Sequence, residues 1–194
     1  VATSHYDRDS FYEADGRIYY DDGVTPVTYG IDVSTHQNEI DWNAVAADGI
    51  DFAMIRAGYG KVANQKDPYF EQNMKNAKAA GIEINEFYMP GMGGREYARQ
   101  SALDTADVMN QVNPDFIRIR SMALAENLEM YEDYETGLLT RPNDVETIGE
   151  IRLFLENLHG ITSWVDSDHI LNILLELKGR LPQDKDRMLA LIDR

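Results

Sequence analysis

Cysteine is absent from the 194-residue sequence, and this absence excludes several kinds of chemistry. Without cysteine the chain forms no disulfide, has no thiolate nucleophile and cannot hold an iron–sulfur cluster or a thiolate-bound zinc. A run of about 18 consecutive apolar residues, the length that spans a bilayer, is also missing. We therefore expect a soluble protein with no membrane-spanning segment and no cysteine-held cofactor.

Basic residues are scarce. Lys and Arg number 18 against 34 Asp and Glu, which gives a formal net charge of −16. Nucleic acids and anionic membrane surfaces are bound through clusters of Lys and Arg, so we expect neither as a partner. The hydrophobic content of 43% is typical of a folded globular chain. The length suits one domain but is short for a complete eight-stranded β/α barrel, which usually takes about 250 residues.

Residues 1–27 are polar and rich in tyrosine, and they precede the regular part of the chain. We interpret them as an N-terminal arm or hairpin. Arg17 to Tyr20 and Val24 to Val27 flank Asp21-Asp22-Gly23, and Asp-Gly favours a hairpin turn. Residues 28–194 are expected to form a single α/β domain.

Short apolar strands alternate with longer amphipathic helices from residue 28 onward. This rhythm predicts about five strands, at residues 29–34, 52–57, 82–89, 116–121 and 161–165. It predicts helices at residues 41–48, 67–80, 95–112, 129–135, 144–158, 168–177 and 184–193. Repeated strand–helix units indicate a parallel, barrel-like sheet of the partial TIM type, and an open doubly wound sheet is the alternative. An unclosed sheet leaves an edge to be covered by the arm, a C-terminal helix or a second copy in a homodimer.

Functional side chains in such folds gather at the carboxyl ends of the strands. The polar and aromatic residues at these positions are Asp32, Ser34, Arg56, Tyr59, Glu86, Tyr88, Arg118, Arg120, Asp166, Asp168 and His169. Asp166, Asp168 and His169 have the composition of a metal or acid–base cluster. Asp168 is also a suitable N-cap for the apolar segment that follows it, and we favour that interpretation. We therefore expect no metal and no cofactor.

One stretch resembles glycoside hydrolase family 25, the lysozyme-like muramidases. The matching residues are Gly30-Ile-Asp-Val-Ser-Thr-His-Gln, Ile40-Asp-Trp, Ala46 to Gly60, Asp67-Pro-Tyr-Phe-Glu-Gln-Asn and Ala77-Lys-Ala-Ala-Gly. The resemblance implies that Asp32 lies at the tip of the first strand in a sugar-binding groove. It also implies a general acid in an Asp-x-Glu motif after the fourth strand. Here the fourth strand reads Phe116-Ile-Arg-Ile-Arg-Ser, with arginines where carboxylates are needed.

A second resemblance covers residues 82–194, beginning at the Gly81-Ile that opens the third strand. Segments such as Gly81 to Glu96, Asn113 to Arg120, Ser167 to Asn172 and Gly179 to Arg194 resemble the later strands of radical S-adenosylmethionine enzymes. That family uses a partial barrel and a C-x-x-x-C-x-x-C cluster loop. Because the chain has no cysteine, the resemblance implies at most a remnant of a nucleoside-binding wall.

The two resemblances meet near Gly81. From this we expect a recombined, engineered barrel chimera of residues 28–81 and 82–194. Such a chimera would have no intact catalytic site, so we do not expect an enzyme. The first alternative is a muramidase-like hydrolase acting on peptidoglycan, with weak glycan binding. Its catalytic carboxyl groups would be Asp32 and a substitute acid, Glu86 or Asp166. The second is residual binding of S-adenosylmethionine or another nucleoside. The expected ligand contacts are Tyr59, Tyr88, Arg118 and Asp166. The lysozyme-like family implies secretion and the radical enzymes a cytoplasmic location, so the location stays open.

Overall fold

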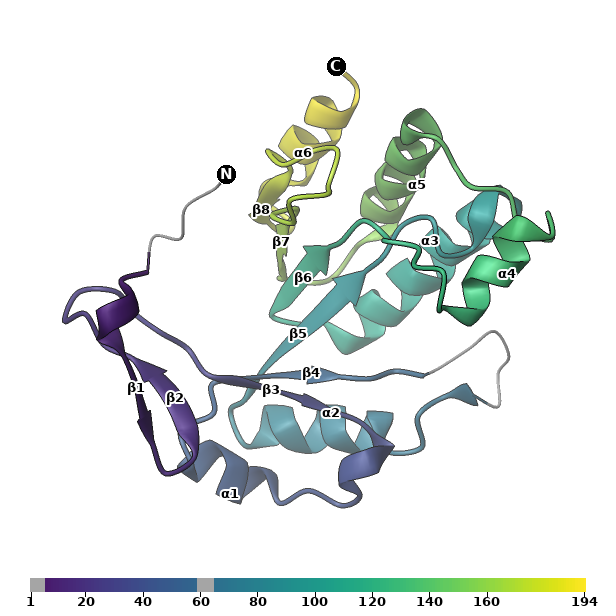
Figure 1. Cartoon of the computed structure of the whole chain (residues 1–194). Coiled ribbons are helices and arrows are strands. Elements are labelled where there is room, and N and C mark those ends of the chain that lie inside the picture. The colour runs from purple at the N-terminus through teal and green to yellow at the C-terminus, as the bar shows by residue number, and fades with distance from the viewer. Residues whose placement is uncertain (1–5, 59–64) are drawn as a thin grey trace.

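The computed structural model describes residues 6–58 and 65–194 (Figure 1). A short helix η1 (Arg8–Ser10) leads into a two-stranded antiparallel hairpin of β1 (Phe11–Ala14) and β2 (Arg17–Tyr20). Its turn is Asp15-Gly16, whose positive φ angles of 50° and 75° suit an Asp-Gly hairpin turn. The prediction of a hairpin turn at Asp22-Gly23 is therefore wrong, because the turn lies at the preceding Asp-Gly pair. The Asp22 carboxylate instead accepts hydrogen bonds from the amides of Val24 and Thr25.

The main sheet has six strands, β3 (Gly30–Val33), β4 (Phe52–Ile55), β5 (Glu83–Tyr88), β6 (Phe116–Ile119), β7 (Trp164–Asp166) and β8 (Lys178–Arg180). Their spatial order follows the chain, and the first five are parallel. A sequential order has no point at which the strand order reverses, so the doubly wound alternative is wrong. The sheet is curved but not closed, and β8, which was not predicted, runs antiparallel to β7.

Helices follow most strands, as the alternating pattern predicted. They are the short η2 (Thr35–Gln37), then α1 (Trp42–Ala47), α2 (Phe70–Ala79), α3 (Gly94–Val112), α4 (Glu129–Glu135), α5 (Asp144–Asn157) and α6 (Lys185–Ile192). Local capping explains several starting points. The Asp41 carboxylate accepts from the amides of Asn43 and Ala44 at the start of α1, and Asn143 and Glu146 form a capping box on α5.

The segment between β7 and β8 is not the helix that its apolar composition predicts. Residues 167–177 form turns, and they are held by the buried side chain of Asn172. Its Nδ2 donates to the Ile119 carbonyl at 2.8 Å and to Ser167 Oγ at 2.9 Å, and its Oδ1 accepts from the Ser121 amide at 2.7 Å. These long-range bonds satisfy the end of β6, which a helix cap at Asp168 would not do.

Two hydrophobic clusters lie on the helix-facing side of the sheet. One surrounds Trp42, Ile55 and Phe70 and includes Ile84 of β5. The other surrounds Tyr88, Ile117 and Phe154 and extends to α6. Figure 1 shows the same division, with α1 and α2 covering β3 and β4, and α3 and α5 beside β5 and β6. Strand β5 therefore contributes to both clusters and joins them.

Strands β3 and β8 form the two edges of the open sheet. The expected homodimer through an exposed edge stays a prediction. The β8 edge carries exposed Lys178 and Arg180, and charged side chains on an edge strand oppose edge-to-edge pairing. Across residues 6–58 and 65–194, no helix combines the length and the apolar character needed to cross a bilayer.

Candidate functional site

The inner face of the curved sheet carries the polar and aromatic side chains, because successive residues of a strand point to opposite faces. One row across the sheet, given by the strand register, is Asp32, Met54, Asn85, Phe116 and Trp164. The next row toward the carboxyl ends contains Phe87, Arg118 and Asp166. The opposite face carries the buried residues of the two hydrophobic clusters. Asp32, Arg118 and Asp166 therefore share one face.

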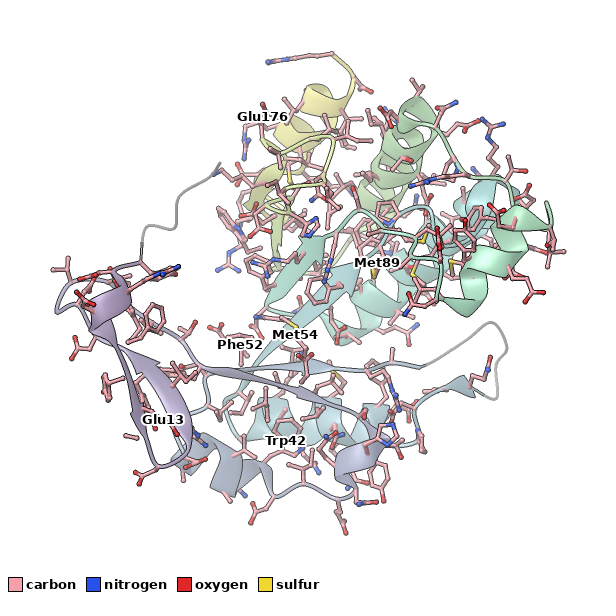
Figure 2. The ribbon with its side chains drawn as sticks, viewed as in Figure 1. Glu13, Trp42, Phe52, Met54, Met89 and Glu176 are labelled. Atoms are coloured by element: carbon pink, nitrogen blue, oxygen red, sulfur yellow. The ribbon has the colours of Figure 1, made fainter. Side chains whose placement is uncertain are left out.

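Asp32 lines a cavity of about 750 Å³ at the carboxyl ends of β3, β4 and β5. Polar residues on its wall include Ser34, Gln37, Arg56 and Asn85, and Met54, Met89 and Met92 add apolar surface. Figure 2 shows Met54 beside β4 and Met89 near the end of β5. Asp32 itself is exposed. A cavity with a few polar groups on an apolar wall is the usual form of a small-molecule site.

A buried ion pair fixes the loop that follows Asp32. Asp67 is 1% exposed, and its Oδ2 accepts from Arg56 Nη2 at 2.9 Å and from the Thr35 amide at 2.8 Å. Its Oδ1 accepts from the Tyr69 amide at 3.0 Å. Burial alone would raise the pKa of Asp67, but these amides and the Arg56 guanidinium outweigh it and hold the pKa below its ordinary value. The sequence predicted Asp67 only as the start of a helix, so its role at the site was missed.

Glu86 follows Asn85 on β5, so its side chain points to the opposite face of the sheet. That face also carries the buried Ile84 and Tyr88. Burial raises the pKa of Glu86 to about 8, and its Oε1 has no hydrogen-bond partner among the described residues. Pairing of β4 with β5 ends at Met54 and Asn85, whereas β5 continues alongside β6 to Tyr88. Glu86 therefore lies where β4 and β5 separate. It lines the Asp32 cavity and also a cavity of about 260 Å³ next to α3.

Tyr88 and Glu150 hold the loop that borders the Asp32 cavity. Tyr88 is buried and stacks on Phe154 at 3.9 Å between ring centroids, and its hydroxyl lies 3.3 Å from Glu150 Oε1. Glu150 Oε2 accepts from the Gly91 amide at 3.0 Å, and burial raises the pKa of Glu150. The structure thus places Tyr88 in the core, away from the inner face. Glu150 was not predicted, because its partners are distant in the sequence.

Arg118 and its neighbours occupy the inner face near β7. Arg118 Nη2 donates to Asp168 Oδ2 at 2.7 Å, and the guanidinium carbon lies 5.7 Å from the centre of the Phe116 ring. Asp166 Oδ2 accepts from Trp164 Nε1 at 3.3 Å. His169 Nδ1 accepts from the Leu171 amide at 3.3 Å. Among the described residues it forms no hydrogen bond with Asp166 or Asp168. Within residues 6–58 and 65–194, no three metal-ligating side chains converge. Tyr59 lies outside the described residues.

Comparison with known proteins identifies the first part of the site. Residues 31–105 match the family model described as "Glycosyl hydrolases family 25". Over this stretch the chain is similar to that family. Lysozyme M1 of Streptomyces globisporus is 47% identical over 53 residues, which is 27% of this chain and 17% of that protein. Asp32, Arg56, Asp67 and Glu86 all lie within the matched residues.

Solved structures with a similar fold extend over more of the chain. The modular autolysin LytC from Streptococcus pneumoniae aligns over 81% of this chain and 38% of its own, with a TM-score of 0.50 and 19% identity. Elp3 from the archaeon Methanocaldococcus infernus aligns over 76% and 36%, with a TM-score of 0.54 and 18% identity. A family 25 glycosyl hydrolase from Bacillus anthracis aligns over 81% and 61%, with a TM-score of 0.45 and 18% identity. This chain therefore spans less than two thirds of each relative, and identities this low show likeness of fold alone.

These findings overturn the interpretation of the chain as a recombined, engineered barrel without an intact site. The family 25 match does not end at Gly81, where we placed the junction, but continues to residue 105. The LytC fold likeness also covers most of the chain rather than its first part alone. The lysozyme-like alternative is the one that the comparisons support.

Proposed function

We propose that this chain acts on peptidoglycan glycan strands as a lysozyme-like glycoside hydrolase, with Asp32 in its active site. The observation that carries this proposal is the position of Asp32. It lies at the carboxyl end of β3, in a cavity of about 750 Å³, inside the stretch that matches family 25. One LytC structure holds a synthetic peptidoglycan ligand, which is the substrate class we propose here.

The second carboxyl group of the proposed reaction is Glu86. Glycoside hydrolysis uses one ionised carboxylate and one protonated carboxyl group that donates to the leaving oxygen. With its pKa raised to about 8, Glu86 is protonated at neutral pH, and it lines the same cavity as Asp32. One strand, β4, lies between them, which corresponds to roughly 10 Å along the sheet at the usual strand spacing. This is a distance between strand backbones, and the proposed reaction requires the two carboxyl groups to lie roughly 6.5–9.5 Å apart, as in inverting enzymes.

Asp166 is a less suitable partner for Asp32. It shares the inner face, but β4, β5 and β6 lie between β3 and β7. That separation is roughly 19 Å along the sheet, about twice the upper end of the inverting range and more than three times the retaining separation. Glu86 is closer to Asp32 along the sheet, but its side chain points to the helix-facing side. In the proposed reaction its carboxyl group reaches the cavity through the opening where β4 and β5 separate.

Clearance of a suspension of bacterial cell walls tests the proposal. We expect the turbidity to fall with the unaltered chain and to stay constant with Asp32→Asn. Glu86→Gln should reduce the rate by at least about a hundredfold, since the general acid typically contributes that much. Glu13→Gln is the matched control, because Glu13 is exposed on the hairpin, and Figure 2 shows it well away from Met54 and Met89, which line the cavity. Absence of clearance by the folded, unaltered chain would refute the proposal.

The kinship of residues 82–194 is a separate proposal. We infer that this part shares its strand–helix wall with the partial barrel of radical S-adenosylmethionine enzymes. The resemblance of its sequence segments supports this, and the fold likeness to Elp3, which extends over 76% of the chain, agrees with it without singling out residues 82–194. The kinship concerns the origin of the wall and not its chemistry, since the chain has no cysteine to hold a cluster.

A further inference from the structure

The loop of residues 90–93, between β5 and α3, forms part of the wall of the Asp32 cavity. Met89, which precedes the loop, and the exposed Met92 within it both line that cavity. Gly91 lies between them and is buried, with a φ of 89°, a conformation that favours glycine. The position of the Met92 side chain therefore depends on how the Gly91 backbone is held.

Side chains from two distant helices bond to both polar groups of the Gly91 backbone. The Gly91 amide donates to Glu150 Oε2 of α5 at 3.0 Å, and the Gly91 carbonyl accepts from the Tyr134 hydroxyl of α4 at 2.9 Å. The carbonyl also accepts from the Gly94 amide at 3.1 Å, which closes the turn locally. Glu150 and Tyr134 thus hold Gly91 from two sides, although they are 59 and 43 residues away in the sequence.

Glu150 also connects the loop to the end of β5. Its side chain is buried, and its second oxygen, Oε1, accepts from the Tyr88 hydroxyl at 3.3 Å. Tyr88 is itself held by stacking on Phe154. A carboxylate has two oxygens that accept from the two donors, whereas an amide side chain has a single acceptor oxygen. The residue type at position 150 therefore suits both bonds.

An acid is an unfavourable residue with which to fill the core at this position. A buried carboxyl group destabilises the fold unless it is hydrogen-bonded, and an apolar side chain of similar size would avoid this penalty. Such departures from local rules are expected at functional sites. At Glu150 the departure coincides with the loop that borders the Asp32 cavity, so we connect the bond to Gly91 with the function of that cavity.

Residues that follow α4 lie along another side of the loop. The Arg95 amide donates to the Thr140 carbonyl at 2.9 Å, and the Thr140 amide donates to Glu96 Oε2 at 3.0 Å. Pro142 lies against Gly91, where a Cβ on the glycine would be 3.4 Å from Pro142 Cγ. Figure 1 shows α4 beside α3. The loop is therefore enclosed between α5 and the residues that follow α4.

We propose that Tyr134 and Glu150 are positioning residues for the Asp32 cavity. By holding Gly91 from two sides, they fix Met92 on the cavity wall. The inference rests on the proposed function, since it assigns these residues to the same glycan site. Both residues lie beyond the stretch that matches family 25, so the assignment comes from the contacts of this chain. Neither residue is on the described wall of the cavity, so their effect on a ligand passes through the loop.

The methyl signals of the methionines test the position of the loop without any turnover. In a chain labelled with [methyl-13C]methionine, the Met92 signal reports on the loop, and the signal of the buried Met188 on α6 is the internal reference. Tyr134→Phe removes one bond to Gly91, and Glu150→Leu removes the other. We expect each variant to shift or broaden the Met92 signal and to leave the Met188 signal in place.

Tyr131→Phe and Glu156→Leu are the matched controls on the same two helices. Tyr131 is half-buried on α4, as Tyr134 is, and Glu156 is exposed on α5, where it pairs with Arg152. Both controls should leave the Met92 signal unchanged. Glu150→Gln, which keeps one of the two acceptor oxygens, serves where Glu150→Leu does not fold. Far-UV circular dichroism and the melting temperature verify that each variant is folded.

The rate of cell-wall clearance at increasing wall concentrations tests the consequence for the proposed reaction. A displaced Met92 weakens glycan binding but leaves Asp32 and Glu86 in place. The wall concentration for half-maximal rate should therefore rise about threefold or more, while the maximal rate stays within about twofold. A variant that is merely less stable contains less folded chain, which lowers the maximal rate at an unchanged half-maximal concentration.

The outcomes separate this inference from the proposed function. A Met92 signal that stays in place in both folded variants overturns the inference, as does a half-maximal concentration equal to that of the controls. Absence of clearance by the unaltered chain refutes the hydrolase. In that case a shifted Met92 signal still supports the positioning of the loop by Tyr134 and Glu150, and an unshifted one overturns it.

Discussion

Two acids within the family 25 stretch, the buried Asp67 and the half-buried Glu86, differ in what surrounds their carboxyl groups. Burial by itself would raise the pKa of both carboxyl groups. Asp67 receives hydrogen bonds from two amides and a guanidinium, so its pKa falls below the ordinary value. Glu86 Oε1 receives none from the described residues, and its pKa rises to about 8. The two residues therefore affect folding stability in opposite pH ranges.

Asp67→Asn should lower the free energy of unfolding at pH 7 by about 2 kcal/mol, since three donors lose an ionised acceptor. The folded pKa of Asp67 is below its ordinary value of 3.8, so the contribution is present above that pH and is lost as the pH falls through the folded pKa. Urea unfolding at pH 7 and near pH 3 measures this. Asp51→Asn, at an exposed carboxylate that accepts one amide, is the control and should cost less. Equal losses in the two variants would contradict the role of Asp67.

Glu86→Gln should flatten the dependence of stability on pH between about 4.5 and 8. An acid whose pKa is raised on folding stabilises the fold fully below its unfolded pKa, and this contribution is lost as the pH rises through the folded pKa. From 4.5 to about 8 the effect amounts to a few kcal/mol. Unfolding curves for the unaltered chain and Glu86→Gln should therefore diverge with rising pH, with Glu86→Gln the more stable at pH 8.

Glu150 also has a raised pKa, so it contributes to the pH dependence of stability in both chains. The difference between the unaltered chain and Glu86→Gln therefore isolates the effect of Glu86. Glu13→Gln, on the exposed hairpin, should leave the pH dependence unchanged. A wild-type slope retained in Glu86→Gln would show that Glu86 is ionised in the folded chain.

At the scale of single residues, the sequence predicted the positions that local rules decide. The ends of parallel strands predicted that Asp32, Arg118 and Asp166 share one edge of the sheet. The alternation of Ile84, Glu86 and Tyr88 places Glu86 on the helix-facing side, whereas we predicted Glu86 as the partner of Asp32 and Tyr88 as a ligand contact. The partners of Asp67 and Glu150 could not be predicted, because they depend on contacts between residues about 30 to 60 positions apart.

At the scale of elements, helices with clear caps were predicted closely, and segments held by tertiary bonds were not. Helix α5 begins after its Asn143 cap, close to the prediction, whereas α4 occupies the predicted residues without a side-chain cap. Residues 167–177 have a helical apolar pattern but bond to β6 through Asn172, so tertiary hydrogen bonding overrode the local preference. The hairpin formed at Asp15-Gly16 rather than at Asp22-Gly23, where the Asp22 side chain ties the chain into a local turn.

Two glycines on different elements allow a matched test of these local rules. Gly16 has a φ of 75° in the hairpin turn, whereas Gly149 lies inside α5 without a positive φ, and neither would place a new Cβ within 4 Å of another group. Gly16→Ala should therefore destabilise the chain by about 1 kcal/mol through backbone strain. Gly149→Ala should stabilise it by about 0.5–1 kcal/mol through helix propensity. Thermal unfolding measures both, and a shift of the same sign in the two variants would contradict this account.

At the scale of the whole molecule, the two hydrophobic clusters are connected mainly through β5. Its first half pairs with β4 and its second half pairs with β6, so β5 contributes Ile84 to one cluster and Tyr88 to the other. Between the helices of the two clusters lies a groove of about 620 Å³ lined mostly by α2 and α3 residues. At its end Val112 of α3 packs against the first cluster, and Lys78 Nζ of α2 donates to the Val112 and Asn113 carbonyls. That residues 28–194 form one domain stays a prediction.

We expect the two clusters to unfold at different denaturant concentrations, because few buried contacts join them. Each part contains one tryptophan, Trp42 buried beneath β3 and β4, and Trp164 on β7. The chains Trp164→Phe and Trp42→Phe therefore report the two parts separately by fluorescence. We expect the midpoints of their urea curves to differ, while circular dichroism of either chain shows both transitions. If the two fluorescence curves and the circular dichroism curve of each chain coincide, β5 couples the clusters into one cooperative unit and the sheet behaves as a single core despite its opening at Glu86.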